Sequence, residues 1–346
     1  MVTLGQSAMR RAFAVATLTI ATLAAVPSGP ANAEEAFEAT GLPLHKVTDI
    51  PLGGRTTRFD YESFDSTRHL LFIAHLGDSE VVVFNTNLSR VVGRVADVSS
   101  VHGVLAIPEL GRVYASATGE DSVVAIDMAT LGIAARIPTG AYPDGMAYAP
   151  DVHKVYVSDE AGGSETVIDV TSNRRVATIS LGGEAGNTQY DPNSRHVFVN
   201  VQTRNQLIEI DPASDQIVAR IDVPGAKGNH GLLIDADQRL AFIACEGNNR
   251  LIVFDMRTMR ATSSFDVGED PDVLAYDPAL HLLYVAGEAG VVSLFRVEAG
   301  VVSKLGDGYV GPNAHIVAVA SETHRSYFPL KNLDGRPVLR ILEPQR

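Results

Sequence analysis

The sequence predicts an all-β fold, a seven-bladed β-propeller whose blades are four-stranded antiparallel sheets. Short runs rich in Val, Ile, Tyr and Thr alternate with Pro, Gly, Asp and Asn, as in strands joined by turns. The pattern repeats at a nearly constant interval, and one strand of each repeat carries an aromatic residue. These residues are Phe72, Tyr114, Tyr156, Phe198, Phe242, Tyr284 and Tyr327, with separations of 42, 42, 42, 44, 42 and 43 residues. A period of this length with four strands is typical of a propeller, and seven aromatics predict seven blades.

The repeat over residues 140–183 shows the four strands most clearly. They are expected at 146–148, 155–158, 166–169 and 176–179. In five repeats the third strand closes on an acid or amide, namely Asn85, Asp127, Asp169, Asp211 and Asp255. Asp or Asn followed by Ser or Thr forms Asx turns, so we interpret these residues as structural.

The two ends of the chain complement each other. Residues 45–54 have the pattern of a fourth strand, whereas the last repeat supplies three strands at 316–320, 326–330 and 338–342 and then stops. We therefore expect the N-terminal strand to complete the last blade and close the ring without a covalent link. Residues 34–346 would then form a single domain.

Residues 1–33 have the three parts of a secretory signal peptide. Arg10 and Arg11 precede an apolar run, which is followed by Pro27 and by an A-x-A site that ends at Ala33. The apolar run is too short to span a membrane, and no later stretch is long enough. We therefore expect an exported protein, periplasmic or secreted, with no membrane span after cleavage.

Charge and cysteine content narrow the range of possible functions. After cleavage the chain has 26 basic and 41 acidic residues, a net charge of −15, which argues against nucleic acid as a partner. Cys245 is the only cysteine and lies in an apolar run, so we expect a small buried side chain rather than a disulfide or a haem attachment.

Several strands resemble the YVTN repeat of YncE-like bacterial propellers. The resemblance rests on Tyr156-Val-Ser-Asp, Phe198-Val-Asn-Val and Tyr284-Val-Ala-Gly, together with following strands such as Val123-Val-Ala-Ile-Asp-Met-Ala-Thr. It extends over residues 59–345 and implies the propeller fold. Members of the wider group include binding proteins, electron-transfer subunits and lactone-opening enzymes, so the resemblance implies no single activity. The Trp-Asp pair of WD repeats and the paired glycines of kelch repeats are missing.

Functional residues are expected where the repeats differ, at the mouth of the central channel. The first strand of each blade lines that channel, and alignment on the aromatic residue places one residue per blade at its mouth. In order these are Asp60, His102, Asp144, Gly186, His230, Asp272 and His315. Aspartate also forms turns, but histidine is not a favoured turn residue. We therefore predict that His102, His230 and His315 bind one divalent transition metal ion, with carboxylates nearby.

The loops between second and third strands should add a second layer on the same face. Together with the mouth aspartates, the predicted ligand-binding residues are Arg58, Asp60, His75, Asp144, Glu160, Asn187, Glu246, Asp272, Glu288 and Lys331. The remaining loop histidines, His153, His196, His281 and His324, precede second strands and are expected on the opposite face as framework.

Two functions from different classes fit this mouth. The first is a monomeric binding propeller that holds a small ligand, a metal ion or a protein partner. The alternative is a metal-dependent lyase or hydrolase that uses the same axial site. The sequence has no GxSxG, HExxH or P-loop motif to decide in favour of catalysis.

Overall fold

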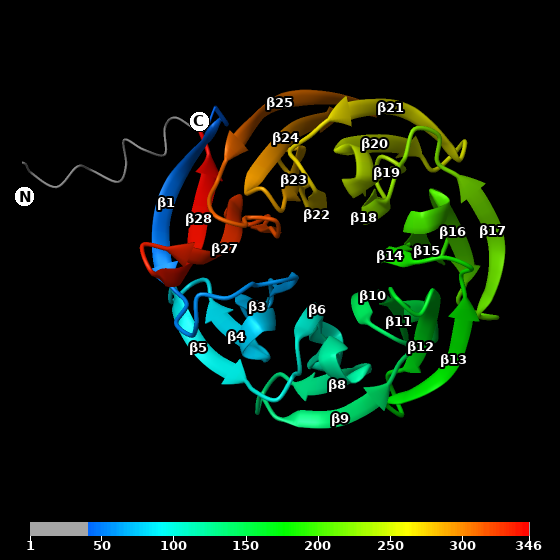
Figure 1. Cartoon of the computed structure of the whole chain (residues 1–346), viewed down its shortest axis with the longest axis horizontal. Helices are drawn as coiled ribbons and strands as arrows, with labels where there is room; N and C mark the ends of the chain where they lie inside the picture. The colour runs from blue at the N-terminus through cyan, green and yellow to red at the C-terminus, as the bar shows by residue number, and fades with distance from the viewer. Residues whose placement is uncertain (1–40, 346) are drawn as a thin grey trace, which may run out of the picture.

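The computed structural model describes residues 41–345, which form seven four-stranded antiparallel sheets arranged as blades around an axis (Figure 1). Each of the first six blades is a meander of consecutive strands, from the inner edge outward. The predicted seven-bladed propeller is confirmed. The predicted signal peptide, residues 1–33, lies outside the described residues, among which no helix is long and apolar enough to cross a membrane.

The strands of blades one to three are β2 (Glu62–Asp65), β3 (Leu70–His75), β4 (Glu80–Asn85), β5 (Arg90–Val95), β6 (Val101–Ile107), β7 (Arg112–Ala117), β8 (Ser122–Asp127), β9 (Ile133–Pro138), β10 (Pro143–Ala149), β11 (Lys154–Asp159), β12 (Ser164–Asp169) and β13 (Arg174–Ser180). Those of blades four to six are β14 (Ala185–Asp191), β15 (His196–Val201), β16 (Gln206–Asp211), β17 (Gln216–Asp222), β18 (Asn229–Asp235), β19 (Leu240–Cys245), β20 (Arg250–Asp255), β21 (Arg260–Asp266), β22 (Pro271–Asp277), β23 (Leu282–Gly287), β24 (Val291–Glu298) and β25 (Val301–Tyr309). Blade seven has β26 (Ala318–Ala320), β27 (Arg325–Leu333), β28 (Arg336–Pro344) and β1 (Leu44–Pro51).

In residues 41–345, six single-turn 3-10 helices connect strands. They are η2 (Leu76–Asp78), η3 (Pro108–Leu110), η4 (Thr118–Glu120), η5 (Pro150–Val152), η6 (Gln202–Arg204) and η7 (Glu246–Asn248). Four of them, η2, η4, η6 and η7, follow the second strand of their blade, and two, η3 and η5, follow the first.

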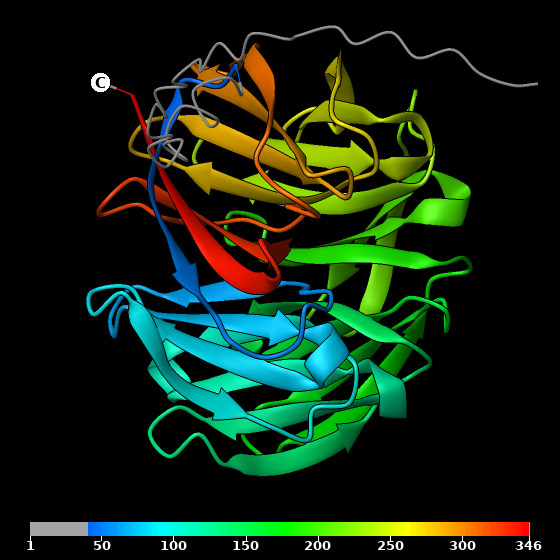
Figure 2. The same ribbon diagram turned by 60° about the vertical axis from the view of Figure 1, so that its left-hand side comes forward.

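The two ends of the chain close the ring as predicted. Strand β1 pairs with β28 in antiparallel register, from Leu44 opposite Pro344 to Pro51 opposite Val338, and the two strands lie side by side in Figures 1 and 2. The pair is fixed by Arg340, whose Nε and Nη2 donate to the two carboxylate oxygens of Asp49 at 2.8 and 2.7 Å. Ring closure therefore leaves the last blade with its full set of four strands.

The core lies between successive blades. All seven repeat aromatics are at most 2% exposed. Tyr114 of β7, for example, packs with Val155 and Val157 of the next blade. Each sheet therefore covers its neighbour, which removes apolar surface from water at about 25 cal/mol per Å².

The repeated polar residues serve the turns. The carboxylate of Asp127 accepts hydrogen bonds from the backbone N–H groups of Ala129 and Thr130, and Asp255 does the same for its own turn. His153 has a positive φ of 55° at the end of η5, so it serves the turn as expected. Cys245 is buried as predicted, and burial raises the pKa of its thiol to about 12.

Candidate functional site

Five inner strands are bulged where they reach the mouth of the channel. In β6, β10, β14, β18 and β22 the pairing with the second strand slips by one residue near the N-terminal end. In β18, for instance, Asn229 pairs with Cys245 and the next pair is Leu232 with Ile243, so His230 and Gly231 lie in the bulge. A bulge twists the strand and re-aims its side chains, which is common beside functional sites. The aligned mouth residues of these blades all occupy such bulges.

Glycine follows the mouth residue in three of these bulges because neighbouring inner strands approach closely. A β-carbon on Gly103 would lie 2.1 Å from the carbonyl oxygen of Asp144, and one on Gly231 would lie 2.2 Å from that of Asp272. Tyr61 follows Asp60 in the first blade as Gly103 follows His102. There the side chain is the largest of the set, and it reaches across the axis.

The mouth opens into a cavity of about 590 Å³. Its lining includes nine of the predicted site residues, namely Arg58, Asp60, His102, Asp144, Glu160, His230, Glu246, Asp272 and Glu288. Loops and inner strands from blades one, two, three, five and six therefore share one face, as the alignment predicts. Sequence reasoning missed Tyr61, Ser100, Thr118 and Tyr142, which also line the cavity.

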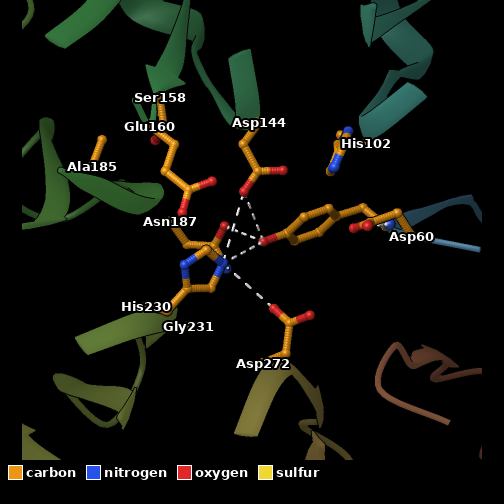
Figure 3. Close-up of polar contacts among 12 residues, drawn as sticks. Asp60, His102, Asp144, Ser158, Glu160, Ala185, Asn187, His230, Gly231 and Asp272 are labelled. Carbon is orange, nitrogen blue, oxygen red and sulfur yellow. Dashed lines mark hydrogen bonds and ion pairs between the residues drawn. The ribbon is translucent and has the colours of Figure 1, made fainter. Parts of the chain in front are cut away.

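The Tyr61 hydroxyl is the centre of a polar network at the axis. It donates to Asn187 Oδ1 at 2.6 Å and lies 3.1 Å from His230 Nε2 and 3.4 Å from Asp144 Oδ2. Figure 3 shows Asp144, Asn187 and His230 converging from three different blades. These side chains meet only when the ring is complete.

Two carboxylate–imidazole clusters lie next to each other and share Asp272. In the first, His230 Nε2 is 3.5 Å from Asp272 Oδ1, and His230 Nδ1 is 3.9 Å from Glu246 Oε1. In the second, His315 Nε2 is 3.8 Å from Asp272 Oδ2 and 3.9 Å from Glu288 Oε1. In each cluster the three residues offer ligand atoms within 4.8 Å of one another.

Several polar atoms of these clusters and of the neighbouring Asp144 have no hydrogen-bond partner among the described residues. They are Asp144 Oδ1, His230 Nδ1, Asp272 Oδ1 and His315 Nε2, and all four side chains are buried. An unpaired buried polar atom costs about 1–3 kcal/mol, so a group of them around one cavity calls for a bound species that completes their bonding.

Burial and mutual repulsion dominate the electrostatics of the mouth. Burial raises the pKa of Asp272 well above its usual range, and the charges of Asp60 and Glu246 raise it further. The pKa of Asp144 is raised well above its usual range by burial, although the nearby His230 opposes the shift. A cation in the cavity would stabilise the ionised form of both aspartates.

The pKa values of the two buried histidines shift in opposite directions. Burial lowers the pKa of His230, but the charges of Glu246 and Asp144 outweigh burial and leave that pKa raised. Burial also lowers the pKa of His315, and there it prevails, so His315 is neutral. His315 Nδ1 donates to the Asn313 carbonyl at 3.0 Å, which leaves the Nε2 lone pair directed at Asp272 and Glu288.

His102 is placed differently from the other two predicted metal ligands. Its Nδ1 donates to the Ser100 carbonyl at 2.8 Å, and its Nε2 is engaged by the Tyr142 hydroxyl at 2.9 Å. His102 lines the cavity but belongs to neither three-residue cluster of the described chain. The structure thus brings His230 and His315 together around Asp272 and leaves His102 bonded to Tyr142.

Four predicted site residues, His75, Asn187, His315 and Lys331, are not among those that line the cavity; His315 is fully buried, and Asn187 accepts from Tyr61 as described above. Lys331 lies on β27 outside the lining, and His75 is fully buried, stacked on Phe59 with ring centroids 4.1 Å apart. His75 forms a third cluster with Asp78 and Glu80. The carboxylates of that cluster are already paired with arginines, Asp78 with Arg55 and Glu80 with Arg94, so they are neutralised within the protein.

The donor set of the mouth clusters suits a divalent metal ion. Imidazole nitrogen is a good ligand for Zn²⁺, Fe²⁺ and Ni²⁺, and carboxylate oxygen for Mn²⁺ and Mg²⁺. One imidazole with two carboxylates per cluster therefore fits Mn²⁺ or Zn²⁺ as the first ions to test.

Comparison with known proteins supports the fold. No family model matches the chain, and no curated protein was found to be similar in sequence. Solved structures with a similar fold include hydrazine synthase of Kuenenia stuttgartiensis, with a TM-score of 0.71 and 15% identity over 84% of this chain and 96% of that chain. The WD40 repeats of RRP9 give a TM-score of 0.72 at 10% identity, covering 85% and 97% of the two chains. A chain of the mitotic checkpoint complex gives 0.72 at 12% identity, covering 94% and 98%. The protein is a seven-bladed β-propeller. At identities this low, the similarity to these proteins concerns the fold alone.

Proposed function

We propose that this protein is a binding propeller whose axial mouth holds a divalent metal ion, with His230, Glu246 and Asp272 as its ligands. One observation carries the proposal. Buried, unpartnered atoms of His230 and Asp272 lie in a cluster whose three ligand atoms are within 4.8 Å of one another. An ion there would supply the bonding that these atoms lack.

The charge of the cavity supports a cationic ligand. Its lining includes six carboxylates, Asp60, Asp144, Glu160, Glu246, Asp272 and Glu288, and one arginine, Arg58. Acids that line a concave site focus a negative potential in it, which concentrates cations and repels anions. The metal ion can in turn present open coordination positions to a small molecule that enters the cavity.

The proposal includes export and a place among YVTN-like propellers. The basic, apolar and A-x-A segments of residues 1–33 support secretion to the periplasm or beyond. The YVTN-like strands and the propeller fold support the relationship. In an exported protein the mouth would meet the metal ions of the extracytoplasmic space.

A second candidate function is a metal-dependent lyase or hydrolase, favoured by the Tyr61–His230 pair. The Tyr61 hydroxyl lies 3.1 Å from His230 Nε2, directly beside the proposed ligands. Burial raises the pKa of Tyr61 well above its usual range, and the charge of Asp144 adds to the shift. Tyr61 is therefore a protonated donor at neutral pH, the form that a general acid needs.

Calorimetric titration of the chelator-treated mature protein tests the binding function. We expect Mn²⁺ or Zn²⁺ to bind and to raise the midpoint of thermal unfolding. His230→Ala should weaken binding by about 100-fold or more, since it removes a ligand. His196→Ala is the matched control because His196 pairs with Glu209 at 2.6 Å away from the mouth. A wild-type protein that binds and is stabilised by neither ion would contradict the proposal.

A further inference from the structure

The carboxylate of Asp272 faces two imidazoles at once. Its Oδ1 lies 3.5 Å from His230 Nε2, and its Oδ2 lies 3.8 Å from His315 Nε2. Each imidazole also faces a glutamate of its own at 3.9 Å, Glu246 for the first and Glu288 for the second. A carboxylate that directs one oxygen to each of two ligand sets is arranged as a bridge between two cation positions.

His315 independently indicates the second position. Its side chain has no exposed surface, and its Nε2 has no hydrogen-bond partner among the described residues. Because Nδ1 donates to the Asn313 carbonyl, Nε2 carries the lone pair, and that lone pair is directed at Asp272 and Glu288. At 3.8 and 3.9 Å the two carboxylate oxygens are beyond hydrogen-bond distance of this nitrogen, whereas all three atoms can bind one cation placed between them.

Arg58 contacts the second cluster through Glu288 and the shared Asp272, and among the described residues it pairs with neither His230 nor Glu246. Its Nη1 pairs with Glu288 Oε1, its Nη2 lies 4.0 Å from Asp272 Oδ2, and its Nε donates to Asp60 at 3.1 Å. The first two oxygens are the same atoms that face His315. In the described part of the chain Glu246 of the first cluster pairs with no lysine or arginine.

We propose that Arg58 is a built-in cation that holds the second position, so that the native mouth binds one metal ion rather than two. This inference rests on the proposed function. The guanidinium sits on the oxygens that a second ion would need, and its tether to blade one keeps its local concentration high. A second ion must displace it, whereas the first ion meets no such competitor at His230.

Metal stoichiometry of an arginine variant tests the inference. Chelator-treated wild-type protein, equilibrated with Mn²⁺ and freed of unbound ion, should retain one Mn²⁺ per chain. Arg58→Gln should retain two, and their shared carboxylate should broaden the electron paramagnetic resonance spectrum relative to isolated Mn²⁺. Arg58→Gln combined with His315→Ala should return to one. Arg250→Gln is the matched control, because Arg250 pairs with Asp266 at 3.0 Å outside the mouth, and it should retain one.

The outcomes separate the two proposals. One ion in wild type and one in Arg58→Gln would overturn the role of Arg58 and leave the proposed function standing. Two ions in wild type would also overturn it, since Arg58 would then exclude nothing. No ion in wild type would contradict the proposed function itself. Circular dichroism verifies the fold of each variant, and Arg58→Met serves as the second replacement if the glutamine variant fails to fold.

Discussion

The inner strands carry buried aspartates at both ends, and the aspartates at the two ends differ in their bonding partners and in the direction of their pKa shift. At the far end of β14, Asp191 accepts hydrogen bonds from Ser194 and pairs with Arg239 through both oxygens at 2.7 and 2.6 Å. Burial opposes its ionisation, but these bonds prevail and lower the pKa of Asp191. At the mouth end of β22, Asp272 is 5% exposed, its Oδ1 has no hydrogen-bond partner among the described residues, and its pKa is raised well above its usual range.

This difference separates structural acids from binding acids on one repeated scaffold. A carboxylate with its full set of donors stabilises the turn that it closes. A buried carboxylate without donors destabilises the protein until a cation arrives. The same residue type at the two ends of equivalent strands therefore has two roles, and its bonding partners decide which.

The largest expected effect is a loss of stability on substitution of Asp191, at the far end of β14. Asp191→Ala removes a fully buried carboxylate and leaves the part-buried Arg239 without its partner, so we expect the free energy of unfolding to fall by about 3 kcal/mol. Urea denaturation measures the change. Metal affinity of the folded variant should equal that of wild type. A loss of stability below about 1 kcal/mol would show that the far-end pair is not structural.

At the mouth, we expect a substitution to change metal affinity and to leave stability nearly unchanged. Asp272→Asn removes a charged ligand, so we expect metal affinity to fall at least 100-fold, about 2.7 kcal/mol. Without metal the variant should be as stable as wild type or slightly more stable, because a neutral amide replaces a buried carboxyl whose Oδ1 has no hydrogen-bond partner among the described residues. Titration calorimetry and urea denaturation of the metal-free protein provide the two readouts. A metal-free variant that is much less stable would place Asp272 with the structural acids.

Asp49 at the ring closure should behave like a far-end acid and show it in pH dependence. Burial raises its pKa, but the hydrogen bonds and charge of Arg340 prevail and lower it. A lowered folded pKa means that the stabilisation is present above the unfolded pKa of about 3.9 and is lost as pH falls through the folded value. Asp49→Asn should therefore cost about 2 kcal/mol at neutral pH. The difference from wild type should shrink below about pH 4, as urea denaturation across pH would show. A difference that is constant with pH would contradict the role of this ion pair.

The smallest expected effect concerns the bulge that positions Asp272. A β-carbon on Gly231 would meet the Asp272 carbonyl at 2.2 Å, so Gly231→Ala must shift that backbone. We expect metal affinity to fall about tenfold, about 1.4 kcal/mol. Gly132→Ala is the matched control, because its nearest contact would be at 3.4 Å in an outer turn. Equal affinities in calorimetry for the two variants would show that the close approach does not position the ligand.

The fold could be predicted from the sequence because the same pattern of strands and turns recurs in every blade. The period of the aromatic residues predicts seven blades, and the unmatched strands at the two ends predict the pairing of β1 with β28. The same alignment selects His230, Asp272 and His315, because a position whose residue type changes from blade to blade is not required for the repeated structure.

The details of the site were less predictable because they depend on packing across the axis. His75 has the residue type of a ligand, yet it is the last residue of strand β3 and is buried against Phe59, a contact that spacing along the chain does not indicate. Tyr61 was missed although a signal was present, since the equivalent positions in three other blades are glycine. The partner of His102 lies 40 residues away at Tyr142, a contact between neighbouring blades that no local pattern indicates.

Anomalous diffraction from crystals soaked in Mn²⁺ or Zn²⁺ tests the central claim most directly, because it locates the ion instead of inferring it. The account predicts one anomalous peak per chain, bonded to His230, Glu246 and Asp272, with Arg58 still on Glu288. A peak at His75, Asp78 and Glu80, or a fully soaked crystal with no peak in the axial cavity, would contradict it.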